Sequence, residues 1–281
     1  MVPKILFYSY KGGTGRSCAV ANVATELAIS GKKVFLIDLD IEGPSLKVIF
    51  DIGSETISDD LYVQDYLRFT EEENWPYDKA IINLKELYES RNEIDGTFTG
   101  ELYFLPASES YDKTVRFHGD TVQRKIDLLL KKIEKQYNID VILIDSPNGY
   151  GPMTQQAFFI SDLIVVLFKW SKQHINGTSK ISEIMRYLDI DYLPVASVVP
   201  ITQNQFLLDI YAAEMSKKLN KDIEFSIPEN DAFKWSEQCV MNKKNNFIST
   251  GKADIDKNVR NQNKNLVEAY KKLSEKLVEY I

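Results

Sequence analysis

Residues 11–17, which read Lys11-Gly12-Gly13-Thr14-Gly15-Arg16-Ser17, organise the rest of the chain. They follow an apolar run, residues 5–8, and lead into the alanine- and valine-rich residues 19–24, a pattern that predicts a helix. A strand, a glycine-rich turn and a helix start in this order form a phosphate-binding loop. Glycines let the backbone curl so that successive N–H groups face an anion, and the positive end of the helix dipole adds to the attraction. The stretch therefore predicts a site for a phosphorylated ligand.

The loop departs from the full phosphate-binding pattern, G-x-x-x-x-G-K-[ST]. Tyr10 stands where the first Gly belongs and Arg16 where the Lys belongs, so Gly15 and Ser17 are the fixed positions that match. Lys11 precedes two glycines, and this combination resembles the deviant P-loop of the ParA/MinD superfamily, in the variant with Arg in place of the second lysine. The resemblance implies ATP and Mg²⁺ as cofactors. The alternative is a chance glycine turn between a strand and a helix.

Acidic residues end two further apolar runs. Asp38 and Asp40 follow residues 34–37, and Asp145 follows residues 141–144. Because ligands of parallel α/β sheets bind outside the carboxyl ends of the strands, these carboxylates are more than surface charge. Both segments resemble the switch regions of the same superfamily, and the D-S-P-x-G run from Asp145 is similar to that of MinD-like proteins. The alternative for Asp38 and Asp40 is that they cap the next helix.

The resemblance implies a role for individual residues. Lys11, Arg16 and Asp40 would be catalytic: Lys11 would reach the phosphates of a dimer partner, Arg16 would clamp phosphate oxygens, and Asp40 would orient the attacking water. Ser17, Asp38 and Asp145 would hold or surround Mg²⁺. The nucleotide contacts expected besides these are Gly12, Gly13, Thr14, Gly15, Cys18, Gly149, Pro228 and Phe233.

Length and composition are those of an ordinary globular chain, with 281 residues, 44% of them hydrophobic and 27% charged. No apolar run approaches the ~18–20 residues of a membrane span, and the first residues do not resemble a signal peptide. We therefore expect a cytoplasmic protein that does not associate with membranes. Cys18 is interpreted as a small buried residue and not as a nucleophile. The net charge of −7 argues against wholesale nucleic-acid binding, which leaves DNA as a weakly supported partner.

Alternating strand and helix signals predict an α/β fold, a doubly wound, mostly parallel sheet of about seven strands. We expect a single P-loop ATPase domain over residues 1–281, with a helical elaboration at about 50–100 and a C-terminal helix at about 256–280. The elaboration is the predicted surface for a family-specific partner. The terminal helix is expected to pack on its own sheet through a stripe that includes Leu266 and Tyr270. Other expected helices are 62–67, 81–88, 122–137 and 177–188.

The resemblance implies a molecular switch that binds ATP, dimerises around ATP and Mg²⁺ to control an unidentified protein partner, and hydrolyses ATP slowly. One alternative is a nucleotide-binding scaffold without turnover, which Arg16 favours and the strand-end aspartates disfavour. The other is a bacterial P-loop tyrosine kinase, suggested by 15 tyrosines but disfavoured because they form no terminal cluster. Residues 169–172 (Lys-Trp-Ser-Lys) depart from the small or polar loop usual in the family. Residues 199–203 lack the Asn that reads adenine in many relatives, so base specificity stays open.

Overall fold

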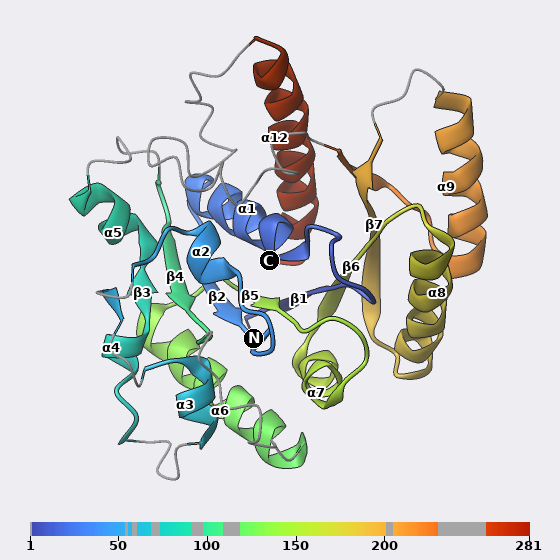
Figure 1. The fold of residues 1–281 in the computed structure, drawn as a ribbon. Coiled ribbons are helices and arrows are strands. Elements are labelled where there is room, and N and C mark those ends of the chain that lie inside the picture. Colours follow the sequence, from blue (N-terminus) through green and yellow to red (C-terminus); the bar gives the residue numbers. More distant parts are fainter. Residues whose placement is uncertain are drawn as a thin grey trace.

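One eight-stranded sheet forms the centre of the computed structural model (Figure 1). The structure describes residues 2–53, 56–57, 61–68, 74–91, 98–108, 119–200, 205–229 and 257–281. The strands are β1 Lys4–Tyr8, β2 Lys33–Asp38, β3 Ile82–Asn83, β4 Glu101–Leu105, β5 Val141–Asp145, β6 Leu163–Phe168, β7 Asp191–Val199 and β8 Phe225–Pro228. Their order across the sheet is β3-β4-β2-β5-β1-β6-β7-β8.

All neighbouring strands pair in parallel except β3 and β4. Every residue of β1, β5 and β6 is buried, as expected for parallel strands that are covered on both faces. The predicted doubly wound α/β fold is confirmed. The sheet exceeds the expected seven strands because the elaboration adds β3, a two-residue strand whose Ile82 lies opposite Phe104.

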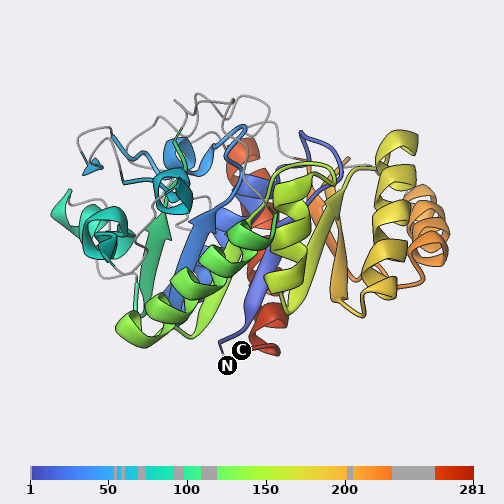
Figure 2. The ribbon, with the colours of Figure 1, turned by 90° about the horizontal axis from the view of Figure 1, so that it is seen from below.

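Helices cover both faces of the sheet (Figures 1 and 2). They are α1 Arg16–Ile29, α2 Leu46–Ile49, α3 Val63–Arg68, α4 Tyr77–Ala80, α5 Leu84–Ser90, α6 Gly119–Tyr137, α7 Pro152–Ile160, α8 Lys172–Tyr187, α9 Gln205–Leu219 and α12 Lys257–Val278. Helices α1 and α12 lie on one face, and α6 and α7 lie on the other. Helix α8 contacts β6 and β7, and α9 packs against α8. None of the helices in these described ranges is long and apolar enough to cross a membrane.

Helix α1 is rich in small apolar residues because it is enclosed between the sheet and α12. Most of the predicted stripe of α12 is buried against α1 and β8: Leu266, Tyr270, Leu273 and Leu277 are each at most 2% exposed. Its last expected member, Tyr280, lies beyond the end of α12 and is exposed. The expectation that the stripe packs within its own chain therefore holds, although α1 lies between much of the helix and the sheet.

Several expected helices begin at other residues in the structure: α6, for example, begins at Gly119, three residues earlier than expected. For two others a capping side chain explains the difference. The segment expected as helix 81–88 forms β3 first, and α5 begins at Leu84 because the Asn83 side chain caps it, accepting hydrogen bonds from the amides of Lys85 and Glu86. Helix α8 begins at Lys172, five residues earlier than expected, where the Ser171 hydroxyl accepts a hydrogen bond from the amide of His174.

The elaboration has an aromatic cluster of its own and joins α6 through two buried hydrogen bonds. The rings of Tyr66, Trp75 and Tyr77 lie 5.2–6.0 Å apart. The Tyr66 hydroxyl donates to the carbonyl of Lys125 on α6, and the Lys125 ammonium donates to the carbonyl of Leu67. This part of the chain thereby shares its packing with α6. Its role as a partner surface stays a prediction.

Candidate nucleotide site

The phosphate loop connects β1 to α1 and has the curled backbone that its glycines predict. Gly13 and Gly15 have φ angles of 75° and 73°, in the left-handed region that other residues adopt only at a cost. Gly15 is also the N-cap of α1 and offers no side-chain cap. The first N–H groups of α1 are therefore free of the usual side-chain cap, and a helix start of this kind attracts anions.

Three carboxylates lie at the carboxyl ends of β2 and β5, beside the loop. Asp38 and Asp145 are paired across the two neighbouring strands, and both are fully buried. The backbone amide of Asp40 donates to the Asp38 carboxylate over 2.9 Å. Burial, reinforced by the charge of Asp145, raises the pKa of Asp38 well above its ordinary value, and burial also raises the pKa of Asp40. We call these three carboxylates, Asp38, Asp40 and Asp145, the acidic floor. Because their negative charges are buried close together, the acidic floor requires a cation.

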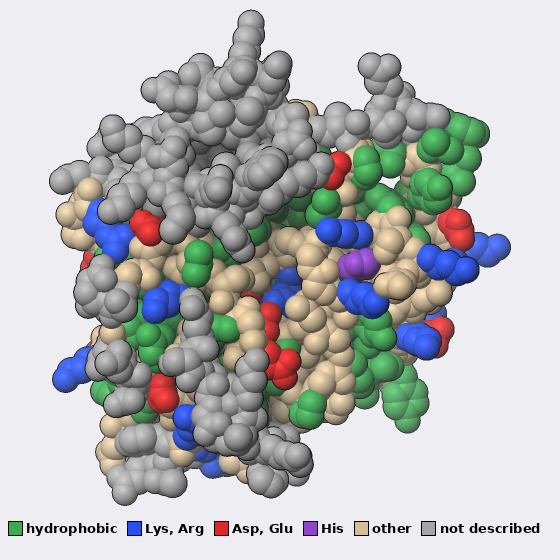
Figure 3. All heavy atoms as spheres, in the orientation of Figure 1, with side chains coloured by type: hydrophobic (Ala, Val, Ile, Leu, Met, Phe, Trp, Pro, Cys, Tyr) green, Lys and Arg blue, Asp and Glu red, His purple; other side chains and the backbone are tan. Residues whose placement is uncertain are grey.

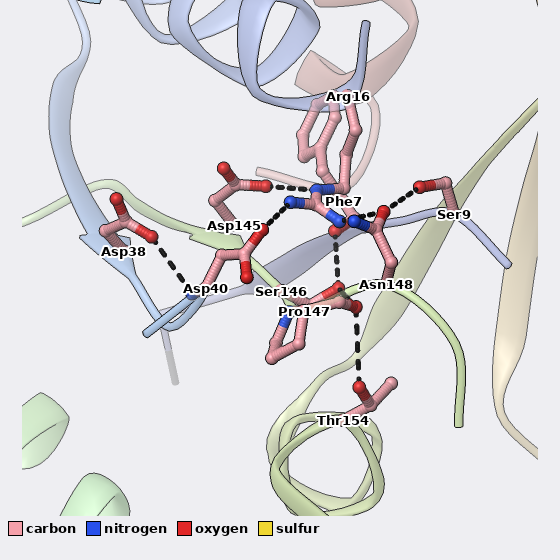
Figure 4. Close-up of polar contacts among 10 residues, drawn as sticks. All are labelled: Phe7, Ser9, Arg16, Asp38, Asp40, Asp145, Ser146, Pro147, Asn148 and Thr154. Atoms are coloured by element: carbon pink, nitrogen blue, oxygen red, sulfur yellow. Dashed lines mark hydrogen bonds and ion pairs between the residues drawn. The ribbon is translucent and has the colours of Figure 1, made fainter. Parts of the chain in front are cut away.

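Arg16 supplies that cation in the structure (Figure 4). Its Nε donates to Asp145 Oδ1 and its Nη2 to Asp40 Oδ2, each over 2.5 Å, and its side chain is 5% exposed. Burial alone lowers the pKa of Arg16, but the charges of Asp145 and Asp40 outweigh this and raise it. The residue expected to clamp phosphate oxygens is thus turned onto the carboxylates, and its role toward phosphate stays a prediction.

Asn148, which the sequence analysis did not assign, connects the acidic floor to the loop. Its Oδ1 accepts hydrogen bonds from Arg16 Nη1 over 2.8 Å and from the Ser9 hydroxyl over 2.9 Å (Figure 4). The amide of Gly149, expected to contact a γ-phosphate, donates instead to the Ser9 carbonyl over 3.2 Å. The signal that could have indicated Asn148 was an amide side chain at the variable position of the D-S-P-x-G run.

A cavity of 460 Å³ opens between the loop and the segment from Asp40 to Ile49. This volume falls within the roughly 300–1,000 Å³ that is typical of small-molecule sites. Six of the predicted contacts line it, from Gly13 to Cys18, together with Asp40 and Asn148. Among the predicted site residues that do not line it are the nucleotide contacts Gly12, Gly149 and Pro228 and the metal residues Asp38 and Asp145. Pro228 ends β8, beyond β6 and β7 in the sheet. Phe233 lies outside the described residues.

The expected metal residues suit Mg²⁺ by their chemistry. In the described part of the chain, Asp38 Oδ2, Asp145 Oδ2 and Thr14 Oγ1 are buried oxygens without a hydrogen-bond partner. The hydroxyl of Ser17 stands at the start of α1 and lines the cavity. Oxygen ligands are those that Mg²⁺ prefers, and it usually completes its shell with water and substrate phosphates. Among the described residues, no group of three His, Cys, Asp or Glu is placed so that it could hold a metal ion.

Two further loop residues bear on the predicted roles. The ammonium of Lys11 is exposed and donates to Gln173 Oε1 of the same chain over 2.8 Å, so reaching a partner requires that this bond open. Cys18 lines the cavity, and burial, with a contribution from Asp145, raises its pKa to about 12. It is a protonated thiol at neutral pH, which agrees with its interpretation as a residue that is not a nucleophile.

Comparison with known proteins places this geometry in a family. A family model described as an AAA domain matches residues 2–192. The chain belongs to the ParA/MinD-type P-loop ATPase family. It is 31% identical to the virulence plasmid ParA family protein pGP5-D of Chlamydia psittaci, over 64% of this chain and 61% of that protein. It is 32% identical to the septum site-determining protein MinD of Helicobacter pylori, over 57% of this chain and 50% of that protein.

A solved structure shows the same fold. The septum site-determining protein MinD of Pyrococcus horikoshii, complexed with Mg-ADP, superimposes with a TM-score of 0.67 at 17% identity, covering 99% of this chain and 96% of that one. This likeness shows the fold, and the family model over residues 2–192 confirms the predicted family. The match spans about half to three fifths of the length of the two curated relatives. Nothing in these relatives favours the tyrosine-kinase alternative.

Proposed function

We propose that this chain is an ATP-dependent switch of the ParA/MinD type, which binds ATP with Mg²⁺, dimerises around it, hydrolyses it slowly and thereby controls a protein partner. The observation that carries the proposal is a cavity lined by the curled loop, Arg16 and Asp40, with Asp145 bonded to Arg16. The loop follows β1, Asp40 follows β2 and Asp145 ends β5, and these three strands are neighbours in the sheet. Family membership supports the same function.

In this proposal each residue of the site has a role that follows from its position. The N–H groups of the loop and of the start of α1 bind the phosphates. Asp40 orients a water for attack on the γ-phosphorus, and the bond from that phosphorus to the bridging oxygen breaks to give ADP and phosphate. Ser17 and Asp145 would hold Mg²⁺, which when bound would neutralise charge on the phosphate oxygens. Arg16 would have to leave its carboxylates to contact phosphate.

A turnover assay with purified chain, ATP and Mg²⁺ tests the activity. Release of phosphate that requires Mg²⁺ supports the switch. The scaffold alternative has one observation in its favour, because the Arg16 guanidinium engages both Asp40 and Asp145. Tight ATP binding without any phosphate release would support the scaffold and contradict turnover.

The exposed position of Lys11 leads to a prediction about assembly. With a non-hydrolysable ATP analogue and Mg²⁺, the wild-type chain should form a dimer, because the Lys11 ammonium can leave Gln173 at little cost and contact the partner's phosphates. Lys11→Ala should remain monomeric, while its affinity for the analogue as a monomer changes little. Size-exclusion chromatography with light scattering measures the mass. Lys180→Ala, at an exposed lysine of α8, is the control. Equal dimerisation of Lys11→Ala and wild type would contradict the trans-acting lysine.

Asp40 should affect the chemical step more than binding. Asp40→Asn keeps the size of the side chain and an oxygen that Arg16 can bond, but it removes the charge that orients water. We expect ATP affinity within a few-fold of wild type and turnover reduced by about 100-fold, the lower range for loss of a proton-handling group. Single-turnover measurements separate the two effects. Glu42→Gln, an exposed carboxyl two residues later, should turn over normally. A wild-type rate in Asp40→Asn would refute this role.

A further inference from the structure

A group of positive side chains lies beside the phosphate loop, on the side of β6 and α8. Lys169 directly follows β6, and Lys172 is the first residue of α8. Lys11 reaches the same helix through Gln173. Figure 3 shows blue side chains around a histidine on this face of the molecule. This is the segment in which the sequence departs from the loop that is usual in the family.

Lys169 is the member of this group that lies over the loop. A Cβ atom built on Gly13 would stand 3.6 Å from the Lys169 ammonium, which is the one atom within 4 Å of it among the described residues outside 12–14. Gly13 is exposed and lines the cavity. The ammonium therefore stands above the curled backbone whose N–H groups are expected to face an anion.

The three cations around the loop differ in what they contact. Arg16 bonds Asp40, Asp145 and Asn148, and Lys11 bonds Gln173. Within the described part of the chain, the Lys169 ammonium has neither a hydrogen-bond partner nor an ion pair. The Lys169 ammonium is half-buried and has no partner among the described residues, so its three N–H donors are available to a ligand. Over a loop of this kind, the ligand that accepts such hydrogen bonds is a phosphate.

The backbone holds Lys169 in this place. The amide of Ser171 donates to the Lys169 carbonyl over 2.7 Å, and the Ser171 side chain caps α8. Trp170 packs edge-on against Phe168 of β6, with ring centroids 5.5 Å apart. The lysine thus extends from a short, doubly anchored turn, which limits the conformational freedom that phosphate binding would cost.

The neighbouring histidine does not supply the positive charge of this site. His174 is buried beside the two lysines, and its Nδ1 has no partner among the described residues. Burial, together with the charges of Lys169 and Lys11, lowers the pKa of His174, so it is neutral at pH 7. The available charge therefore belongs to the lysines.

We propose that Lys169 binds the terminal phosphates of the nucleotide within its own chain, from the β6 side of the loop. This inference rests on the proposed function, because it concerns the same ligand. An ordinary P-loop obtains this in-chain positive charge from its own lysine, at the position where this chain has Arg16. In our proposal Lys169, a residue outside the loop, supplies that charge instead. Arg16 remains engaged with the acidic floor until the nucleotide competes for it.

Calorimetric titration of the full chain with Mg·ATP tests the inference at two salt concentrations. Lys169→Met keeps the length and apolar stem of the side chain and removes the charge. We expect its ATP affinity to fall about tenfold or more, as for the loss of a charged hydrogen bond. Its affinity should also depend less on salt than that of wild type, because one phosphate contact is lost. Lys172→Met should bind within twofold of wild type, and Lys169→Arg should recover most of the loss.

The outcomes separate this inference from the function on which it rests. If wild type binds ATP and Lys169→Met binds it equally well, the inference about Lys169 is wrong and the proposed function stands. If wild type binds no ATP, both are wrong. Thermal unfolding without nucleotide should be unchanged in Lys169→Met, since no described group loses a partner. A lower affinity accompanied by an unchanged salt dependence would indicate a structural effect and overturn the phosphate contact.

Discussion

Arg16→Ala should unfold on the order of 10 °C below wild type at neutral pH without nucleotide. The guanidinium is 5% exposed and bonds two buried carboxylates, those of Asp40 and Asp145, with a third, Asp38, beside them. Its removal leaves three acidic groups at the ends of β2 and β5 without the cation that the structure places on them. Breaking a buried ion pair from one side costs about 3–5 kcal/mol. In a domain of this size each kcal/mol corresponds to about 2–4 °C.

The deficit of Arg16→Ala should shrink on acidification. Burial and neighbouring charge raise the folded-state pKa of Asp38 and Asp40, and the charge of Arg16 opposes this at both residues. Without Arg16 those pKa values rise further. A carboxyl with a raised folded-state pKa destabilises the protein fully above that pKa, and the penalty is relieved as the pH falls through it. The melting temperatures of variant and wild type should therefore converge as the pH falls below neutral.

Thermal melts followed by circular dichroism from pH 5 to pH 8 measure both effects. Arg16→Lys is the matched variant. It keeps the positive charge but loses the planar guanidinium group that bonds three residues, so its melting temperature should lie between those of wild type and Arg16→Ala. Asp145→Asn in the Arg16→Ala background removes one of the uncompensated charges and should recover part of the loss. A pH-independent deficit in Arg16→Ala would mean that lost packing, and not buried charge, explains the change.

The strands that position the site could be predicted from the sequence. Parallel strands that are covered on both faces have continuous runs of apolar residues. The apolar run at residues 141–144, with Asp145 after it, forms β5, Val141–Asp145. The positions of Asp38 and Asp145 also followed, since carboxyl ends of parallel strands share one edge of the sheet. Local pattern and topology together suffice for backbone-determined features of this kind.

Side-chain direction could not be predicted in the same way. The resemblance directs Arg16 toward phosphate, whereas the structure shows it on Asp40 and Asp145, because a buried guanidinium pairs with carboxylates within reach. Asn148 was missed for a related reason. Its two hydrogen-bond partners, Arg16 and Ser9, are separated from it by 132 and 139 positions along the chain. No periodicity in the sequence records such partners.

The start of α8 was predicted wrongly because a tertiary contact, and not the local sequence, explains the glycine at residue 177. The helix was expected to begin at Gly177. In the structure Gly177 lies buried in the middle of α8, which runs from Lys172. A Cβ atom added to Gly177 would overlap Cδ1 and Cε1 of Tyr10 and stand 2.5 Å from its Cγ. The glycine is therefore explained by a partner far away in sequence, the tyrosine that replaces the first Gly of the ordinary P-loop.

This contact predicts a strong effect for Gly177→Ala. Helix propensity alone would make the substitution stabilising by about 1 kcal/mol. The overlap with Tyr10 acts in the opposite direction, because the whole ring must leave its place, and Tyr10 is attached directly to the phosphate loop. Overpacking in a closed site costs about 1–3 kcal/mol. We expect a net loss of stability and at least a tenfold loss of Mg·ATP affinity, since the loop backbone must move with the ring.

A second substitution identifies the cause. Tyr10→Gly in the Gly177→Ala background removes the ring and restores the residue of the ordinary pattern, so both melting temperature and ATP affinity should rise toward those of Tyr10→Gly alone. The two changes should thus be strongly non-additive in a double-mutant cycle. Gly151→Ala, where an added Cβ meets nothing within 4 Å, is the control and should behave like wild type. Additive effects, or normal ATP binding by Gly177→Ala, would show that Tyr10 and Gly177 do not jointly fix the loop. Coupling would mean that α8 sets the shape of the phosphate loop in this chain, the task that glycine performs in the ordinary P-loop.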